Sequence, residues 1–268
     1  MTDLDAATLR DVYDAQLRAW MPAKLPPGAV IDRDGPLVRV TGLDHRGFVT
    51  YQTLDGVDGA ELDALIARQR DHFAARGEAV EWKLHGHDLP ADLAERLVAA
   101  GFEPEEPETV VIGLAAPLAS PAPTPEGITL REVTARADLD RIATMEGIVW
   151  NDPDRSYQAE ALEAEVATDP DGIVIVVAET SPDEPVVCAG WVRFVPGTGF
   201  ATLWGGSTLP QWRGRGIYTS LVRYRAALAV ARGFTYLQVD ASDDSRPILQ
   251  RHGFVAVTTT TPYVHPAP

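Results

Sequence analysis

The sequence predicts an α/β fold with a mixed sheet, built as two halves of similar pattern. Short β-branched and apolar runs alternate with amphipathic helical segments along the chain, the pattern of a layered α/β protein. A proline-rich stretch interrupts this alternation near the middle, at residues 116–126. The succession of strand, short helix, Gly-Phe and strand occurs twice, around Gly101-Phe102 and around Gly253-Phe254. These observations predict two related α/β halves.

The first half begins with a helix over Ala6–Trp20, where Leu9, Tyr13 and Leu17 recur at helical spacing. Prolines from Pro22 onward end that helix. A later helix has a proline near its first position and a glycine as its C-terminal stop. The expected strands are 29–31, 37–40, 48–54, 79–84 and 109–114, and the later helices are 62–75 and 89–100, with Pro90 and Gly101 at the ends of the last one.

A linker follows, in which four prolines stand among small residues. Such a composition is typical of a semi-rigid connection between domains. The sequence therefore predicts a first domain at 1–115, a linker at 116–126 and a second domain at 127–268.

The second half repeats the alternation and places a glycine-rich loop after one of its strands. A loop at the carboxyl end of a strand is where such folds bind ligands. The expected strands are 128–133, 173–179, 186–195, 200–208, 234–240 and 254–263, and the expected helices are 137–147, 156–167, 217–231 and 246–251.

Composition limits the classes of partner. The 268-residue chain has a formal net charge of −16, which argues against nucleic acid or an anionic membrane as the main partner. No apolar run approaches the roughly 20 residues of a membrane span. The single cysteine, Cys188, allows no intrachain disulfide, and the start of the chain, Met1–Leu9, is acidic and polar and does not read as a signal peptide. We expect a cytoplasmic protein.

The acidic residues avoid one region. The 55 residues from Pro185 to Val239 contain no Asp or Glu, although the chain average would place about eight there. The same region contains six arginines, namely Arg193, Arg213, Arg215, Arg223, Arg225 and Arg232. A solvated helix face is one interpretation, and a site for a small polyanion is the other.

The glycine-rich loop favours the polyanion. Two arginines alternate with two glycines over Arg213–Gly216, and the residues from Ile217 have helical apolar spacing. Glycines let backbone N–H groups converge on one point, and a helix N-terminus adds unpaired donors and the positive end of its dipole. This arrangement suits a phosphate.

These features together resemble the GNAT superfamily of acyl-CoA-dependent N-acyltransferases, over about Ile128–Val264. Arg213-Gly214-Arg215-Gly216-Ile217 is similar to the family's coenzyme loop, with Pro210 before it, and 245–254 is similar to its short helix and Gly-Phe. A second register, Gln211-x-x-Gly214-x-Gly216, also fits the loop. The two-half layout resembles tandem GNAT proteins, in which one half has lost its coenzyme site; here that is the first half.

The resemblance implies acetyl-CoA as cosubstrate, with no metal, and direct attack by an amine of a small molecule or peptide on the acetyl thioester. A non-catalytic acyl-CoA-binding or scaffold protein is the alternative, and an enzyme of the same fold with a longer acyl group or an oxygen acceptor is a third option. The residues expected to bind the coenzyme include a backbone donor to the thioester carbonyl at Thr208 or Leu209, and two serines after the next strand. The full set is Thr208, Leu209, Arg213, Gly214, Arg215, Gly216, Ile217, Tyr218, Ser242 and Ser245.

Two positions depart from the family pattern. Where the family has the last Gly or Ala of the loop, this sequence has Tyr218, which we expect to crowd the phosphate site or to shift its geometry. The tyrosine that usually protonates the leaving thiolate is replaced by Leu249, which has no proton to give.

Many members of the family take the general base from a glutamate of the strand before the loop. The strand at Phe200–Gly206 has no glutamate, so the base must come from another position. Asp240, at the end of the next strand, is the candidate catalytic residue; a strand-end aspartate that makes turn hydrogen bonds is the structural alternative. Glu146 and Asp152 lie in the region that covers the acceptor in this family, and we expect both to be solvated.

Other residues with possible chemistry favour structural roles. His85-Gly86-His87-Asp88 lacks a fourth metal ligand and is interpreted as a turn. Cys188 and the tryptophans Trp150, Trp191 and Trp204 are expected in the core, although Trp150 also has neighbours suited to a pocket.

Overall fold

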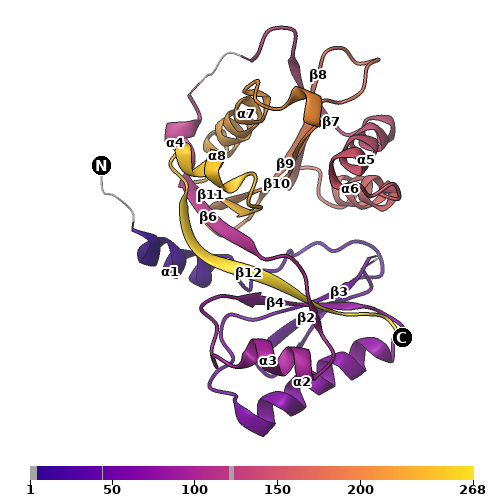
Figure 1. Ribbon diagram of the computed structural model, residues 1–268, viewed down its shortest axis with the longest axis vertical. Helices are drawn as coiled ribbons and strands as arrows, with labels where there is room; N and C mark the ends of the chain where they lie inside the picture. The colour runs from indigo at the N-terminus through magenta and orange to yellow at the C-terminus, as the bar shows by residue number, and fades with distance from the viewer. Residues whose placement is uncertain (1–4, 44, 121–123) are drawn as a thin grey trace. The chain divides into compact units, whose positions relative to one another are not determined.

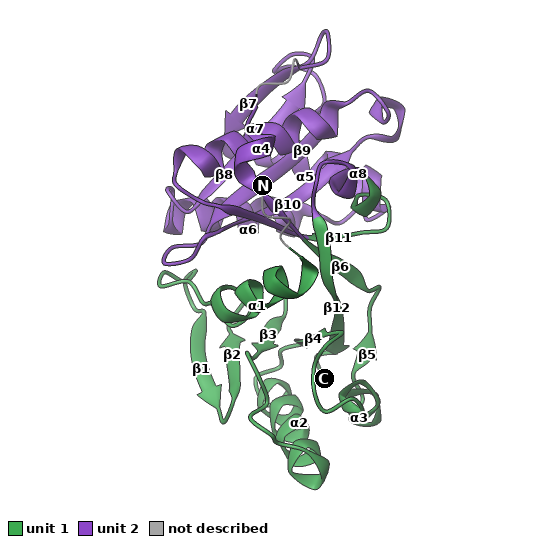
Figure 2. Cartoon of the chain, turned by 90° about the vertical axis from the view of Figure 1, so that its left-hand side faces the viewer, with its two compact units in different colours: residues 1–111, 240–247, 255–268 green, residues 112–239, 248–254 purple. Residues whose placement is uncertain are grey.

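The computed structural model describes residues 5–43, 45–120 and 124–268, and divides the chain into two compact units (Figure 2). Unit 1 contains residues 1–111, 240–247 and 255–268, and unit 2 contains residues 112–239 and 248–254. Three elements include a point where the chain passes from one unit to the other: β6 (Glu108–Leu114), β11 (Tyr236–Ala241) and α8 (Arg246–Arg251).

Unit 2 is organised around a run of neighbouring strands. In spatial order they are β7 (Thr129–Val133), β8 (Ile173–Glu179), β9 (Cys188–Phe194), β10 (Phe200–Thr208) and β11, with antiparallel pairs except for the parallel pair β10 and β11. Its long helices are α5 (Arg136–Trp150), α6 (Ser156–Thr168) and α7 (Ile217–Ala231), and a short 3-10 helix, η1 (Pro210–Trp212), precedes α7.

Alternation along the strands directs side chains to two layers in unit 2. Ile173, Ile175 and Val177 of β8 pack in a core with α5 and α6, whereas Val176 and Ala178 pack with Ile217 and Leu221 of α7. Because successive residues of a strand point to opposite faces, the helices cover both faces of these strands, as Figure 1 shows.

Unit 1 has its own sheet and core. Its strands are β1 (Val30–Asp34), β2 (Leu37–Thr41), β3 (Gly47–Thr50), β4 (Val80–His85), β12 (Val255–His265) and the short β5 (Glu103–Pro104). Its helices are α1 (Ala6–Gln16), α2 (Gly59–Ala74) and α3 (Leu93–Ala99). The core joins α2 and α3 to the strands through Leu62, Leu97, Val49 and the fully buried Trp82. Beta3 and β4 pair in parallel, as β10 and β11 do in unit 2.

The last strand changes the expected division of the chain into 1–115, 116–126 and 127–268. Thr260–His265 of β12 pairs antiparallel with His85–Val80 of β4, so the C-terminal strand belongs to the unit built from the first half. The expected linker also differs at its start, because Ala115–Leu118 forms a short helix, α4, in which Ala115 and Leu118 are buried. Residues 121–123 of the linker lie outside the described part.

Most expected elements are present, with shifted ends. Four have the expected bounds: β8, β10, α7 and α8. The first helix ends at Gln16, four residues before Trp20, and α3 begins at Leu93, so Pro90 precedes the helix and does not occupy its first turn.

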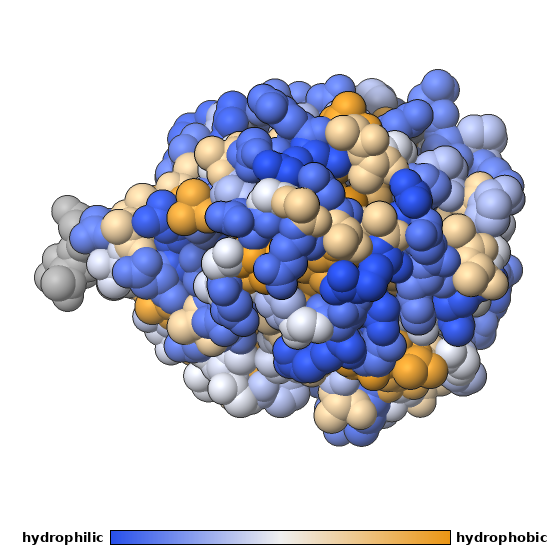
Figure 3. All heavy atoms as spheres, turned by 90° about the horizontal axis from the view of Figure 1, so that it is seen from below, coloured by the Kyte–Doolittle hydropathy of each residue, from blue (hydrophilic) through white to orange (hydrophobic). Residues whose placement is uncertain are grey.

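One face of the molecule is seen in Figure 3, where hydrophilic residues predominate and apolar ones occur in small groups. That distribution is consistent with the net charge of −16. None of the helices in the described part of the chain has the length and apolar character needed to span a membrane.

Beta10 is interrupted close to its end. Its pairing with β9 shifts register between Trp204 and Ser207, and Gly205 has a positive φ of 68°. The carbonyl oxygens of Trp191 and Trp204 both accept hydrogen bonds from Nη1 of Arg225, at 3.1 and 3.0 Å. Arg225 is a residue of α7 and is 1% exposed. The buried guanidinium therefore pairs carbonyl groups at the irregular part of the strand, where a buried acceptor would otherwise lack a partner.

Gly205 tests how strongly this interruption is built in. A Cβ there would lie 2.0 Å from Cζ3 of the Trp191 ring, whereas Gly197, at φ 78°, has open space around the same position. We expect Gly197→Ala to lower the free energy of unfolding by about 1 kcal/mol through backbone strain alone. Gly205→Ala adds overpacking to that strain and is expected to cost about 2–5 kcal/mol. Urea unfolding of both variants measures the difference, and equal losses would show that the Trp191 ring does not confine this turn.

Candidate active site

The glycine loop forms an exposed helix N-terminus in unit 2. Gly214 and Gly216 have φ of 74° and 79°, and Gly216 is the N-cap of α7, with no side chain bonded to the first helical N–H groups. The first intrahelical bond runs from Ser220 N to Gly216 O, so the N–H groups of residues 217–219 precede the helical ladder. A Cβ at either glycine would meet no atom within 4 Å. The loop therefore presents backbone donors in open space.

The two loop arginines are anchored but keep their exposure. Arg213 donates from Nε to the carbonyl of Thr208 at 3.2 Å. Arg215 donates to the carbonyl of Gln211 at 3.2 Å, and its guanidinium lies 4.7 Å from the ring centroid of Trp212. Both side chains are exposed, so both cations flank the helix N-terminus.

The other arginines of the acid-free region have separate partners. Arg193 pairs with Glu165 of α6, Arg223 donates to the carbonyl of Ser120, and Arg232 donates to the carbonyl of Asp171. Arg225 is buried in α7. A single basic surface made of all six arginines is therefore not present in the described chain; the exposed pair at the loop carries the positive charge there.

The strand before the loop has a free edge. Beta10 pairs with β11 only at Phe200, Ala201 and Thr202 in the described structure. Leu209 N donates to Val187 O at 3.0 Å, on the β9 side. Because successive N–H groups of a strand point to opposite edges, the N–H of Thr208 points away from β9. Of the two expected donors, Thr208 is thus directed to the free edge.

Tyr218 occupies a different space from the one expected. A Cβ at Gly206 would lie 2.6 Å from Cε2 of Tyr218, so the ring packs over that glycine of β10. Burial raises the pKa of the Tyr218 hydroxyl. The expectation that this side chain crowds the loop was wrong, because the missing Cβ of Gly206 makes room for the ring beside the strand.

Leu249 lies in the core, with no exposed surface. Cys188 is also fully buried, as expected, and burial raises the pKa of its thiol to about 11.

Glu146 is buried, so the expectation that it is solvated was wrong. The residue is 1% exposed and lies on the face of α5 that carries Leu139 and Ile142. Its Oε1 accepts a hydrogen bond from Ser207 Oγ at 3.3 Å, and Oε2 is a buried atom without a hydrogen bond among the described residues. Arg155 Nη2 lies 3.6 Å from that oxygen.

These surroundings shift the ionisation of Glu146. Burial raises the pKa of the carboxyl to about 7, against a smaller lowering by Arg155 and by the Ser207 hydroxyl. A carboxyl with a pKa near neutrality exchanges protons readily at physiological pH, which is the property required of an acid–base catalyst.

Two tryptophans that were expected in the core are partly exposed. Trp150 lies near the Glu146 carboxyl, and Trp204 is a residue of β10, the strand that carries Ser207. Trp150 is 54% exposed and donates from Nε1 to Ser207 Oγ at 3.1 Å, and Trp204 is 40% exposed. Trp191 is buried, as expected. Helix α5 ends after Trp150 at Asn151, which has a positive φ of 52°; Asp152 is half-buried and lies 3.8 Å from Arg155.

Asp240, the candidate catalytic residue, belongs to unit 1. Its Oδ2 accepts a hydrogen bond from Lys83 Nζ at 2.5 Å, and its side chain is 8% exposed. Burial opposes the charge of Lys83, but Asp240 and Tyr13 more than compensate, and the pKa of the lysine is raised. Glu108 is near the same group, and burial together with the charge of Asp240 raises its pKa to about 7.

Ser242 and Ser245 also lie in unit 1, in the turn that leads to α8. Their hydroxyl oxygens are 3.3 Å apart, and the N–H of Ser245 donates to the carbonyl of Ser242. The other residues expected to bind the coenzyme lie in one segment of unit 2, at Thr208, Leu209 and 213–218.

His85, His87 and Asp88 join a buried polar network in unit 1. His85 Nε2 is 2.9 Å from the hydroxyl of Tyr13, and Asp88 accepts from Tyr51 and pairs with Arg18. Burial, and then the charge of Arg18, lower the pKa of His85 to about 2. No group of three potential metal ligands occurs in the described residues.

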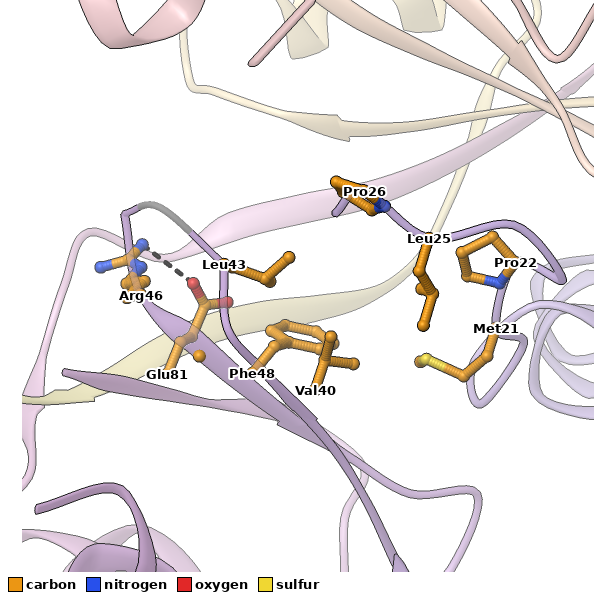
Figure 4. A pocket seen from close by; sticks show the side chains of 10 residues that line it. Met21, Pro22, Leu25, Pro26, Val40, Leu43, Arg46, Phe48 and Glu81 are labelled. Atoms are coloured by element: carbon orange, nitrogen blue, oxygen red, sulfur yellow. Dashed lines mark ion pairs between the residues drawn. The ribbon is translucent and has the colours of Figure 1, made fainter. Parts of the chain in front are cut away.

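A hollow of about 330 Å³ also lies in unit 1, where Arg46 pairs with Glu81 at 2.9 Å (Figure 4). Apolar side chains, among them Met21, Leu25 and Phe48, form most of its wall. Neither loop arginine contributes to it.

Sequence reasoning missed the role of burial at Glu146 and Arg225. The apolar residues Leu139, Ile142 and Ala143 predict, by their spacing, that position 146 falls on the same helix face. A charged residue at a core position is the signal that identifies Glu146. No comparable signal marks Arg225, because its carbonyl acceptors come from strands far away in sequence.

Comparison with known proteins agrees with this geometry. Residues 137–254 match the model of the acetyltransferase (GNAT) family. No curated protein sequence matches the chain.

Several solved structures share the fold. A GCN5-related N-acetyltransferase from Kribbella flavida aligns over 98% of this chain and 96% of its own, with a TM-score of 0.66 and 18% identity. A tandem GNAT protein from the clavulanic acid biosynthesis pathway aligns over 99% and 97%, with a TM-score of 0.65 and 16% identity. A conserved protein of unknown function from Staphylococcus epidermidis aligns over 91% and 96%, with a TM-score of 0.63 and 12% identity.

The family match begins in α5 and ends after α8, and thus includes Glu146, β10, the glycine loop and α7. The structural likeness extends over both units. Residues 137–254 therefore form a GNAT acetyltransferase family domain, in a chain whose fold is that of GNAT proteins, a tandem one among them.

Proposed function

We propose that this protein is an acetyl-CoA-dependent N-acetyltransferase that acts on an amine of a small molecule or peptide. The observation that carries the proposal is the uncapped N-terminus of α7, with its two positive-φ glycines, directly after a strand with a free edge. That arrangement offers donors for a diphosphate and, at Thr208 in the strand before the loop, a donor for a thioester carbonyl.

In this proposal the loop holds the coenzyme. The N–H groups at the start of α7 face the diphosphate, and Arg213 and Arg215 add charge-assisted hydrogen bonds. Gly216, the N-cap of α7, belongs to both registers of the loop, the one from Arg213 and the one from Gln211. Ser242 and Ser245 stay as proposed contacts to the rest of the coenzyme.

The acetyl thioester is the activated group that the coenzyme supplies. The N–H of Thr208 donates to its carbonyl oxygen, on which negative charge develops as the neutral amine attacks. The C–N bond forms, the C–S bond breaks, and the thiolate leaves. Leu249 cannot protonate that thiolate, so its proton comes from the attacking nitrogen or from water.

Asp240 stays a hypothesis for the group that deprotonates or holds the amine. Its Oδ2 already pairs with Lys83 at 2.5 Å. The other candidate carboxyl is that of Glu146, in unit 2. Among the described residues it has no cationic partner at hydrogen-bonding distance.

The competing function is an acyl-CoA-binding protein without catalysis, which the absence of the family's tyrosine and strand glutamate favours. We expect the full-length protein and acetyl-CoA to release thiol at least 100-fold above the rate of hydrolysis with one or more of spermidine, glucosamine, phenethylamine, lysine and a tripeptide. A thiol-reactive dye measures the release. Coenzyme binding with no amine-dependent release from the panel would favour the binding protein instead.

The coenzyme loop is tested at Gly216. We expect Gly216→Val to weaken binding of coenzyme A at least 100-fold, since a branched side chain fills the space in front of the N–H groups. Calorimetric titration measures the affinity. Gly233→Val is the matched control: it lies after the other end of the same helix, has φ 83° and has equally open surroundings, so it carries the same strain and should retain wild-type affinity. Equal affinity of the two variants would remove the loop from the site.

A further inference from the structure

We propose that Glu146 is the general base, and that its Oε2 takes the proton from the ammonium form of the acceptor, directly or through one water. The inference rests on the proposed function and adds to it the residue that prepares the amine. Three observations in unit 2 support it: the burial of the carboxyl with incomplete pairing, its position beside Thr208, and its polar support.

The first observation is that Glu146 lacks the compensation that another buried carboxylate of the same unit receives. Glu179 is equally buried, and Arg131 and Arg141 both contact its oxygens at 2.7 Å. Those two arginines lower the pKa of Glu179 despite its burial. Glu146 has only Arg155, at 3.6 Å. Burial without a close cation destabilises the ionised form of a carboxyl, and a group perturbed in this way is a candidate for acid–base chemistry.

The second observation is geometric. Ser207, which donates to Oε1 of Glu146, precedes Thr208, the residue whose N–H points to the free edge of β10. The Glu146 carboxyl is thus hydrogen-bonded to Ser207, the residue next to Thr208, whose N–H is the proposed carbonyl donor. A base must lie within hydrogen-bond reach of the proton it removes, or one water away. We therefore place an amine that attacks a carbonyl carbon held at Thr208 within this reach of Oε2, the oxygen that has no hydrogen bond among the described residues.

The third observation is the support around the carboxyl. Trp150 donates to Ser207, and Ser207 donates to Oε1, which orients Oε2 away from the strand hydroxyl. Arg155, at the start of α6, is the charged group that faces Oε2, and Asp152 shares that arginine at 3.8 Å. The chain Trp150–Ser207–Glu146 therefore leaves one oxygen available for a proton.

The proton balance follows from these roles. The ammonium gives one proton to the Glu146 carboxylate and becomes a neutral amine. That amine forms the C–N bond, and the tetrahedral intermediate expels the thiolate as the C–S bond breaks. The second proton of the nitrogen passes to the thiolate, and Glu146 returns its proton to solvent. The products are the amide, the free thiol and one released proton.

The base also predicts a pH dependence with a definite sign. The pKa of Glu146 in the folded protein is about 7, above its ordinary value, so kcat should rise with pH through about 7. Ser207 and Arg155 both hold that pKa down. Ser207→Ala and Arg155→Gln should therefore move the rising limb to higher pH.

The pH dependence of folding stability tests the raised pKa of Glu146 without an acceptor amine. A carboxyl whose pKa is raised on folding favours the folded state below its unfolded pKa, and that contribution is lost as the pH rises through about 7. Relative to Glu146→Gln, the wild type should lose stability between pH 4.5 and pH 8. Urea midpoints of both proteins across this range measure the loss, and Glu163→Gln, at an exposed position of α6, controls for the removal of one negative charge.

The decisive experiment compares Glu146→Gln, Asp240→Asn and the wild type with the fastest amine of the panel and with aniline. Aniline is neutral at pH 7 and has no extra proton to lose. We expect Glu146→Gln to lower kcat at least 100-fold with the basic amine and less than tenfold with aniline, with an unchanged affinity for coenzyme A and no rising limb near pH 7.

Three outcomes would overturn the proposal. They are a kcat within threefold of wild type in Glu146→Gln, an equal loss with both amines, and a retained pH limb that only Asp240→Asn removes. If the wild type itself transfers no acetyl group while it binds coenzyme A and the urea midpoints show no pH-dependent loss from Glu146, both the base and the catalytic function fail. If that loss is present, the base role of Glu146 still fails together with the catalytic function, and only its raised pKa is established; transfer by the wild type with a kcat within threefold in Glu146→Gln overturns the base alone.

Discussion

The buried guanidinium of Arg225 is the interaction on which the site depends. Beta10 must stay in its sheet and yet stop pairing with β11 after Thr202. Its register against β9 also shifts between Trp204 and Ser207; such an irregularity leaves backbone carbonyls in the interior, and an unpaired buried acceptor is costly. Arg225 donates to two of them, from the helix that begins with the glycine loop. The same residue thus connects the irregular strand to the helix that carries the proposed coenzyme site.

Burial has a cost for this arginine, since it lowers the pKa of the guanidinium. The residue stays cationic at physiological pH because the ordinary value is far higher. No carboxylate contacts Arg225 among its described hydrogen bonds; its acceptors are the carbonyls of Leu221, Trp191 and Trp204. Its position explains part of the acid-free region: an acidic residue on the neighbouring strands would draw the guanidinium away from the carbonyls.

The two faces of β10 carry different parts of the proposed chemistry. On the α7 side, Tyr218 packs over Gly206 and the glycine loop leads into the helix. On the α5 side, Ser207 supports Glu146. Between them, the free edge directs the N–H of Thr208. A short irregular segment therefore carries the proposed carbonyl donor beside the proposed base and before the glycine loop, and continued pairing with β11 would occupy the N–H of Thr208.

The first half retains the frame of the second but not its site. Beta3 and β4 repeat the parallel pair of β10 and β11, yet no arginine-glycine loop follows β3. Unit 1 instead contains a buried network in which Tyr13 of α1 contacts His85 of β4, while Lys83 of the same strand pairs with Asp240. Ion pairs and hydrogen bonds thus occupy the carboxyl end of β4.

The sequence by itself determined the elements of the fold and the glycine loop. Both depend on local patterns: alternation along β8 and β10, helical spacing in α7, and glycines placed where the backbone needs a positive φ, at Gly214 and Gly216. The GNAT family was predictable from the same residues, because loop, helix and Gly-Phe follow one another along the chain.

Only the tertiary structure decided the partners of the charged groups and the membership of the last strand. Glu146 was expected in solvent, but burial raises its pKa to about 7; Asp240 pairs with Lys83, which is 157 residues away in sequence. The C-terminal strand pairs with β4 of the first half, and the ring of Tyr218 packs over Gly206. Each of these depends on contacts between distant segments, and a side chain's ionisation and packing follow from those contacts, which no local pattern of residues encodes.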